Sequence, residues 1–435
     1  MKMLKLCLLG FVALQSLNSI SQNLDKTFLK NYQSPEFKFR SLNWNLDANS
    51  LGRQITAPNS SETHNAYLRT GLTHYVFSNQ SHYQGTYYTA LSLSGSFESQ
   101  NAFDRFDSNL SLSHNSQNRF YLREKLFIGA HGGLAVSPSI SFEDVDDTLR
   151  NGLNLNVAPS LSIGLGRIEY TTFARQAMDV NRLLNKTGTI GEPLNESQLK
   201  SLSDQIGKIR NKRGFDRRLL RIWQLEQLDS TLNSIGVETT KDIAYFSRLN
   251  DAFYYSQFNS RLSGLRTELG VTTPLRYARH SVHGSSNITS VLGFLKLDYY
   301  LPASYAMQYD LGVSVYGGLN RSEFLDNSTI ERYPVWTTAY FSTGWYPTTR
   351  TRLKATINGG HSMSNSATPG LLAGIQADMY YYLSPATRLA ISGGYNLSND
   401  YDYTNNSNPS YLIENIPSIR YQGYYFNVEF IHQIF

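Results

Sequence analysis

The chain alternates between apolar and polar residues over long stretches. Between Leu153 and Gly166 the odd positions are aliphatic apart from Pro159, and the even positions are Asn, Ala, Ser or Gly. Successive side chains of a β-strand point to opposite faces, so this segment predicts a strand with one apolar and one small, polar face. About fourteen such segments recur, and the last, Tyr424–Phe435, runs to the end of the sequence. One such strand would also fit a soluble sheet, but this repetition is typical of an outer-membrane β-barrel.

The connections between these segments alternate in length. Short links join them at 116–120, 300–305 and 346–350, whereas longer links occupy 47–62 and 399–417. Outer-membrane barrels have short periplasmic turns and longer outer loops, and an even number of antiparallel strands places both termini in the periplasm. We therefore expect an all-β transmembrane barrel of about 14 antiparallel strands, with roughly 12 or 16 strands as alternatives because strand boundaries are hard to read from sequence.

One link, between the sixth and seventh predicted strands, is far longer than a turn. It has helical periodicity, since Leu199, Leu202, Ile206 and Ile209 recur at the spacing of an amphipathic helix. The alternation of the links places this α-helical insertion on the periplasmic side. The expected organisation is a signal peptide at 1–21, a periplasmic N-terminal segment at 22–35, the first half of the barrel at 36–171, the helical insertion at 172–257 and the second half of the barrel at 258–435.

The N-terminus reads as a secretory signal. Lys2 and Lys5 precede an apolar stretch that is followed by small and polar residues. Cleavage after Ser21 would remove both lysines and lower the formal net charge from +5 to +3. It would also remove Cys7, the single cysteine, so we expect no disulfide and no thiolate metal site in the mature chain.

Charged residues in the middle of the predicted strands fall on the polar phase. A lysine or arginine on the lipid side of the bilayer midplane costs about 2–4 kcal/mol, so these charges should face the lumen. Two interpretations remain open: ion pairs that hold the wall together, which we favour, and a path for solutes. The lumen-lining candidates are Arg123, Lys125, Arg266, Glu268, Lys296, Asp298, Asp310, Lys354, Asp378, Arg388 and Glu429.

Aromatic pairs precede three proline-containing turns. They are Tyr299-Tyr300, Trp345-Tyr346 and Tyr381-Tyr382. Amphipathic rings favour the level of the lipid headgroups, so the three pairs predict one aromatic girdle.

A basic cluster lies between the first two helices of the insertion, at 208–221, with seven cations and one acid. Concentrated positive charge suits an acidic periplasmic protein or anionic lipid, and the alternative is a solvated helix face. Nucleic acid is not expected as a partner of an exported barrel. The partner-binding candidates are Lys208, Arg210, Lys212, Arg213, Arg217, Arg218 and Arg221.

Catalytic and cofactor motifs are sparse. His280 and His283 share a predicted outer loop with serines, but the sequence does not supply a positioned nucleophile and base. The acidic run at 143–147 lacks the glycine and the distal glutamate of a calcium loop. We therefore expect no enzyme activity, no cofactor and no bound metal.

Several segments resemble a known kind of protein. The signal peptide, the strand ending Gly166–Tyr170, the segment Arg213–Leu219 of the insertion and the terminal aromatic Phe435 resemble those of Gram-negative outer-membrane barrel proteins with a periplasmic helical insertion. The resemblance implies this architecture, surrounding outer-membrane lipid and the barrel assembly machinery as a partner, without implying an activity. Phe435 is out of phase with Phe426 and Val428, which departs from the usual insertion signal.

Two functions fit these features. A narrow pore or transporter for small solutes would explain the small residues on the lumen phase and a strand number between filled eight-stranded barrels and open porins. The alternative is a structural or interaction protein, in which the barrel anchors a basic helical domain that binds a partner or plugs the lumen. The expected function is the pore, in the outer membrane of a Gram-negative bacterium.

Overall fold

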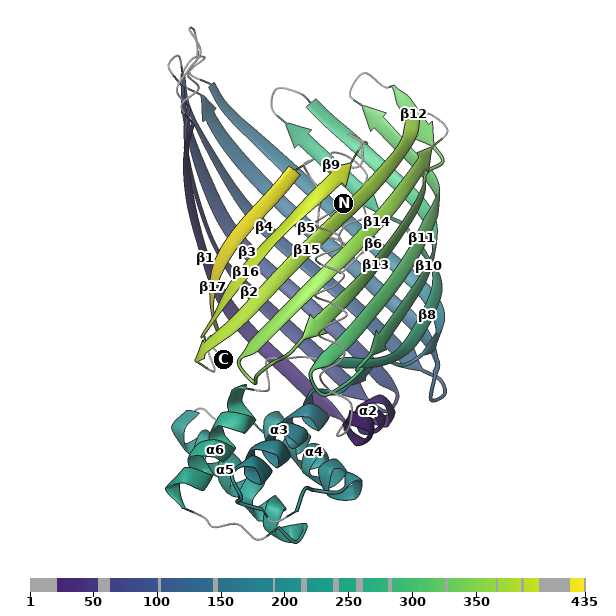
Figure 1. Ribbon diagram of the computed structural model, residues 1–435. Coiled ribbons are helices and arrows are strands. Elements are labelled where there is room, and N and C mark those ends of the chain that lie inside the picture. The colour runs from purple at the N-terminus through teal and green to yellow at the C-terminus, as the bar shows by residue number, and fades with distance from the viewer. Residues whose placement is uncertain are drawn as a thin grey trace, which may run out of the picture.

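Most of the chain forms one antiparallel sheet that closes into a barrel (Figure 1). Closure is made by β1, which pairs with β2 along its length and with β17 through Asn43–Asn45. The computed structural model describes residues 22–433 except 54–62, 101–102, 144–147, 191, 213–216, 238–241, 256–260, 281–283, 325–327, 365–366, 385–386 and 399–422.

The seventeen strands of the described chain occupy fourteen positions around the barrel wall. We call each position, whether it holds one strand or two strands in line, a stave. Strands β8 (Leu262–Thr272) and β9 (Leu275–His280) lie in line as one stave, as do β12 (Thr329–Arg332) and β13 (Val335–Trp345), and the two-residue β7 (Glu169–Tyr170) pairs only with the base of β8. The expectation of fourteen antiparallel strands is confirmed. The other staves are β1 (Phe37–Arg53), β2 (Thr63–Gln80), β3 (Tyr83–Gln100), β4 (Phe103–Tyr121), β5 (Leu126–Glu143), β6 (Thr148–Gly166), β10 (Gly284–Leu301), β11 (Met307–Phe324), β14 (Thr351–Ser364), β15 (Ala367–Ser384), β16 (Thr387–Ser398) and β17 (Gly423–Gln433).

Proline explains the two divided staves. Pro274 separates β8 from β9, and Pro334 separates β12 from β13. Proline has no N–H to give to a neighbouring strand, so the ladder is interrupted there. The carbonyls of both prolines still accept bonds from the adjacent strands, from the N–H of Ser290 at 2.9 Å and from that of Gly318 at 3.2 Å, so each stave stays in register.

The predicted alternation is visible in the exposure of the side chains. On β6, Leu161 and Ile163 are 68% and 60% exposed, whereas Ser160 and Ser162 are buried. The apolar phase therefore covers the outside of the barrel, where lipid would contact it, and the small polar phase faces the lumen.

The helical insertion follows the sixth stave and precedes the seventh, as expected. It contains α3 (Thr172–Lys186), α4 (Glu196–Asn211), α5 (Arg217–Ser234) and α6 (Ile243–Tyr255). Asn195 and Gln198 form a capping box that fixes the start of α4. Among the described residues, no helix is long and apolar enough to cross a membrane.

The insertion lies at one end of the barrel, beside α2 (Gln22–Asn31) (Figure 1). Apart from the insertion, strands are joined at this end by at most five residues, at 81–82, 122–125, 302–306 and 346–350, whereas the links at the opposite end range from two residues between β3 and β4 to 24 between β16 and β17. We name it the short-turn end. One hydrophobic core joins α2 and the start of β1 to the insertion, with Leu29, Phe37, Phe173 and Tyr245 among its buried residues. The N-terminal helix and the insertion are thus packed together under the barrel.

The aromatic girdle is only partly as expected. Trp345 and Tyr381 are each 38% exposed on the outer face, whereas Tyr346 and Tyr382 are buried on the lumen side. Tyr300 also faces the lumen. The prediction that both members of each pair lie in the girdle is therefore wrong for the second member, because neighbouring residues of a strand face opposite ways.

Candidate functional site

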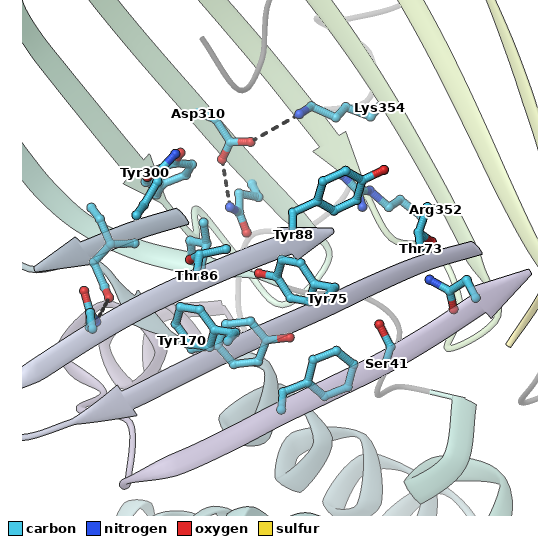
Figure 2. Close-up of a pocket in the computed structure, with 18 of the residues that line it drawn as sticks. Ser41, Thr73, Tyr75, Thr86, Tyr88, Tyr170, Tyr300, Asp310, Arg352 and Lys354 are labelled. Atoms are coloured by element: carbon cyan, nitrogen blue, oxygen red, sulfur yellow. Dashed lines mark hydrogen bonds and ion pairs between the residues drawn. The ribbon is translucent and has the colours of Figure 1, made fainter. Parts of the chain in front are cut away.

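A cavity of about 620 Å³ occupies the lumen near the short-turn end (Figure 2). Its lining comes from β1 to β4, β8, β10, β11 and β13 to β17, so it is a section of the lumen itself and not a groove in the wall. Ile168, Tyr170 and Leu262 line it at the junction with the insertion, whose helices lie beneath (Figure 2). The rest of its lining is rich in tyrosine and arginine.

On one side of the lumen, buried charges of opposite sign form ion pairs. Glu268 of β8 accepts hydrogen bonds from Arg119 of β4 at 3.1 Å and from Ser162 of β6 at 2.6 Å, and it also pairs with His131 of β5. Glu268 is only 2% exposed. Arg266 forms an ion pair with Asp298 of β10 at 2.7 Å. We call this set of residues the paired wall.

On the opposite side, two guanidinium groups form no ion pair with any described residue. Arg352 of β14 and Arg388 of β16 lie beside the ring of Tyr380 on β15. Their guanidinium carbons are 5.4 Å and 5.1 Å, respectively, from the ring centroid. Arg352 also lies 5.9 Å from the ring centroid of Tyr346. The Nε atoms of both arginines are buried and lack a hydrogen-bond partner, and within the described part of the chain neither guanidinium forms an ion pair. We call Arg352, Arg388 and the rings of Tyr346 and Tyr380 the unpaired wall.

Lys354 is intermediate between the paired wall and the unpaired wall in how closely an acid approaches it. Its Nζ is 3.8 Å from a carboxylate oxygen of Asp310, which also accepts a hydrogen bond from Gln308 at 2.7 Å (Figure 2). The lysine is therefore matched by an acid, although at a longer distance than in the paired wall.

Nine of the eleven lumen-lining candidates lie on the lumen side. Besides those described above, Lys296 lies 5.0 Å from the ring centroid of Phe294, Asp378 faces Lys354 across the β14–β15 pair, and Glu429 lies opposite Ala390. The candidates on the lumen side are Arg266, Glu268, Lys296, Asp298, Asp310, Lys354, Asp378, Arg388 and Glu429.

The placement of Arg123 and Lys125 in the lumen is wrong. Both residues are exposed in the turn at 122–125, because β4 continues to Tyr121 before the chain reverses. The sequence placed this turn too early, at 117–119, which hid the inward position of Arg119. Arg352 was also missed, although its alternation with Leu353 gave the same signal as that of Lys354.

The insertion is fixed to the barrel by buried charged groups. Arg261, directly before β8, donates to the carbonyls of Ser304 at 2.7 Å and Met307 at 2.5 Å, and burial lowers its pKa to about 10. Arg175 of α3 is also completely buried, 3.9 Å from Asp179 and 4.7 Å from the ring centroid of Tyr346. Tyr305 of the 302–306 turn donates a hydrogen bond to Asp179. Arg261 therefore remains charged at neutral pH, and these contacts together hold the insertion directly under the cavity.

The cations of the basic cluster at 208–221 differ in their exposure and in their contacts. Arg210 packs inside the insertion, where it donates to the carbonyl of Phe253 and burial lowers its pKa to about 9. The prediction that Arg210 faces a partner is therefore wrong, because its cationic group satisfies a helix carbonyl. Lys212 lies 3.7 Å from the ring centroid of Trp223, and Arg221 donates to Asn250 at 2.7 Å.

The remaining candidates of the cluster lie at or near the surface. Lys208 and Arg218 are exposed. Arg213 lies outside the described residues, and Arg217 begins α5. Among the side chains that the structure describes, the cluster therefore exposes fewer cations to a partner than its sequence suggested.

No group of three or more His, Cys, Asp or Glu side chains in the described part of the chain is arranged to hold a metal ion. The fold and the cavity define a transmembrane β-barrel with a helical domain at its short-turn end. No family model and no curated protein matches the chain.

Among solved structures, the chain has only distant matches. The chain is similar to the toluene transporter TodX of Pseudomonas putida, with 8% identity, a TM-score of 0.32 and coverage of 94% of this chain and 91% of that one. It is also similar to the translocator domain of the autotransporter NalP from Neisseria meningitidis, with 9% identity, a TM-score of 0.31 and coverage of 94% and 91%. A third is CdiB from Acinetobacter baumannii, with 8% identity, a TM-score of 0.33 and coverage of 92% and 60%.

Proposed function

We propose that this protein is an outer-membrane channel for small solutes, closed at its short-turn end by the helical insertion. The observation that carries the proposal is the cavity of about 620 Å³, which extends across the lumen from β1–β4 to β13–β17 directly above the insertion. A barrel of fourteen staves is wider than the eight-stranded barrels that side chains fill and narrower than open porins. A narrow, polar lumen of this kind suits small solutes.

The short-turn end then faces the periplasm, because outer-membrane barrels place their short turns on that side. The insertion would meet a solute as it leaves the barrel. Its attachment through buried Arg175 and Arg261 makes it a fixed closure rather than a tethered domain. Opening would require that these contacts move or that the solute pass beside them.

The test is single-channel conductance in a planar bilayer. The N–H of Thr171 donates to the carbonyl of Arg261 at 2.8 Å, so the two ends of the insertion are adjacent and a short Gly-Ser linker can replace 172–260. We expect the full chain to conduct weakly and the linker variant to conduct steadily, because the closure is removed.

A barrel that is folded but conducts in neither form would refute the channel. Equal conductance of the two forms would show that the insertion closes nothing. The electrophoretic shift of a folded barrel on heating, measured on both proteins, separates these outcomes from misfolding.

A second candidate function is an anchor for a periplasmic partner. The observation that favours it is the surface of α5, where Leu219 and Ile222 are 57% and 49% exposed beside exposed Arg218. An acidic protein with an apolar contact would suit this mixed surface. A photo-crosslinking residue at Ile222 should then give one discrete adduct in cells, whereas the same residue at exposed Lys200 of α4 should not.

A further inference from the structure

Not every cation that lines the cavity is held in an ion pair. Five cationic side chains line it, from Arg119, Arg266, Arg352, Lys354 and Arg388, together with a single carboxylate from Asp310. Acids beside the cavity pair with the first two, and Asp310 lies close to Lys354. Asp310 also acts on Arg352 electrostatically, and Asp378 lies near Tyr380, but within the described part of the chain Arg352 and Arg388 are the two cavity cations without an ion pair.

The two unmatched guanidinium groups converge on one ring. Arg352 and Arg388 come from β14 and β16, and both approach Tyr380 on the strand between them. Two like charges held beside the same ring repel each other, and the buried Nε of each still requires an acceptor. An anion bound next to Tyr380 would relieve the repulsion and accept hydrogen bonds from both groups.

The neighbouring side chains indicate what kind of anion fits. A guanidinium presents a planar fork that matches the two oxygens of a carboxylate. Tyr346 and Tyr382 also line the cavity beside these arginines, and their rings suit a flat organic body. The volume of about 620 Å³ falls within the range of pockets that hold small organic ligands.

We infer that the unpaired wall binds a small organic carboxylate, held by Arg352 and Arg388 and packed against the tyrosine rings. The inference rests on the proposed channel function, since it names the class of solute that the lumen receives. It concerns binding, however, and can be measured without conduction.

The test is isothermal titration of the full chain in detergent with benzoate, benzyl alcohol and inorganic phosphate. We expect benzoate to bind, and the double variant R352Q/R388Q to weaken that binding roughly ten-fold or more, because two charge-assisted contacts are lost. Benzyl alcohol should bind weakly and equally to both proteins. The matched control is R276Q, because Arg276 of β9 lies on the lumen side but does not line the cavity.

Several results would overturn the inference. They are the absence of benzoate binding to the unmodified chain, unchanged binding in R352Q/R388Q, equal loss in R276Q, and tighter binding of phosphate than of benzoate. If the double variant does not fold, R352K and R388K keep the charge but lose the planar fork, and each should still weaken benzoate binding. Benzoate binding by a barrel that does not conduct would reject the channel and leave the carboxylate site standing.

Discussion

The paired wall and the unpaired wall of the lumen both contain arginine, but the arginines have different neighbours. In the paired wall, Glu268 is surrounded by Arg119, His131 and Ser162, and each charge has a partner within hydrogen-bonding distance. In the unpaired wall, Arg352 and Arg388 have aromatic neighbours but form no ion pair with a described residue. A charge that its neighbours balance stabilises the barrel, whereas a charge that they leave unbalanced remains available to a ligand. The partners of a charged residue, and not its residue type, therefore distinguish a structural role from a ligand-binding role.

The largest expected effect comes from breaking the paired wall at Glu268. The substitution Glu268→Ala leaves the buried Arg119 without a counter-charge, and breaking a buried pair in this way costs about 3–5 kcal/mol. Urea unfolding in lipid vesicles, followed by the heat-induced electrophoretic shift, measures the loss. The control is Glu323→Ala, which removes an exposed ion pair with Arg321. An unchanged unfolding midpoint for Glu268→Ala would mean that the paired wall does not hold the barrel together.

The next largest effect is expected where the insertion meets the barrel. The substitution Asp179→Ala removes the acid beside Arg175 and the acceptor of the Tyr305 hydroxyl. Two tyrosine rings still contact Arg175, so we expect a smaller loss than at Glu268, about 2 kcal/mol. Faster tryptic cleavage of the insertion, with an unchanged barrel, would report it.

Tyr305→Phe is the matched variant for this contact. It removes only the hydrogen bond to Asp179 and should cost about 1 kcal/mol. If Asp179→Ala resists trypsin as well as the unmodified chain does, the buried contacts do not fix the insertion.

The unpaired wall should respond in the opposite direction. The double variant R352Q/R388Q removes two charges that form no ion pair and whose buried Nε atoms have no hydrogen-bond partner, so the unfolding free energy should stay the same or rise by about 1 kcal/mol. In a conducting barrel, the same variant should shift the reversal potential in a salt gradient toward lower anion selectivity. A destabilisation as large as that of Glu268→Ala would show that the two walls do not differ.

Much of this fold could be predicted from residue order, because the alternation of strands is local. The fourteen staves, the exposed apolar phase of β6 and the insertion after the sixth stave all follow from periodicity and link length. The turn at 122–125 was misplaced because the polar run 113–119, which belongs to β4, resembles the end of a strand and a turn, and this error moved Arg123 and Lys125 into the lumen.

The candidate site was less accessible to this reasoning. The sequence identified Glu268 and Arg388 as facing the lumen, but it could not show that one is fully paired and the other is not. Ion pairs join strands that are far apart along the chain, as Arg119 and Glu268 are, and their formation depends on the register of closure. Arg210 shows the same limit, because its partner Phe253 lies on another helix.

The smallest expected effect tests whether the ion pairs of the paired wall stabilise the barrel only because they are buried, or whether an exposed ion pair stabilises it equally. Arg350 and Asp251 form an ion pair at 2.6 Å between the 346–350 turn and α6, but their side chains are 38% and 43% exposed. The substitution Asp251→Asn should therefore cost only about 0.2–1 kcal/mol, and the loss should shrink further in high salt. Urea unfolding at low and high salt measures it beside Glu268→Ala. A cost at Asp251 equal to that at Glu268 would mean that burial contributes nothing to the energy of an ion pair, and then the lack of an ion pair at Arg352 and Arg388 among the described residues would carry no energetic meaning.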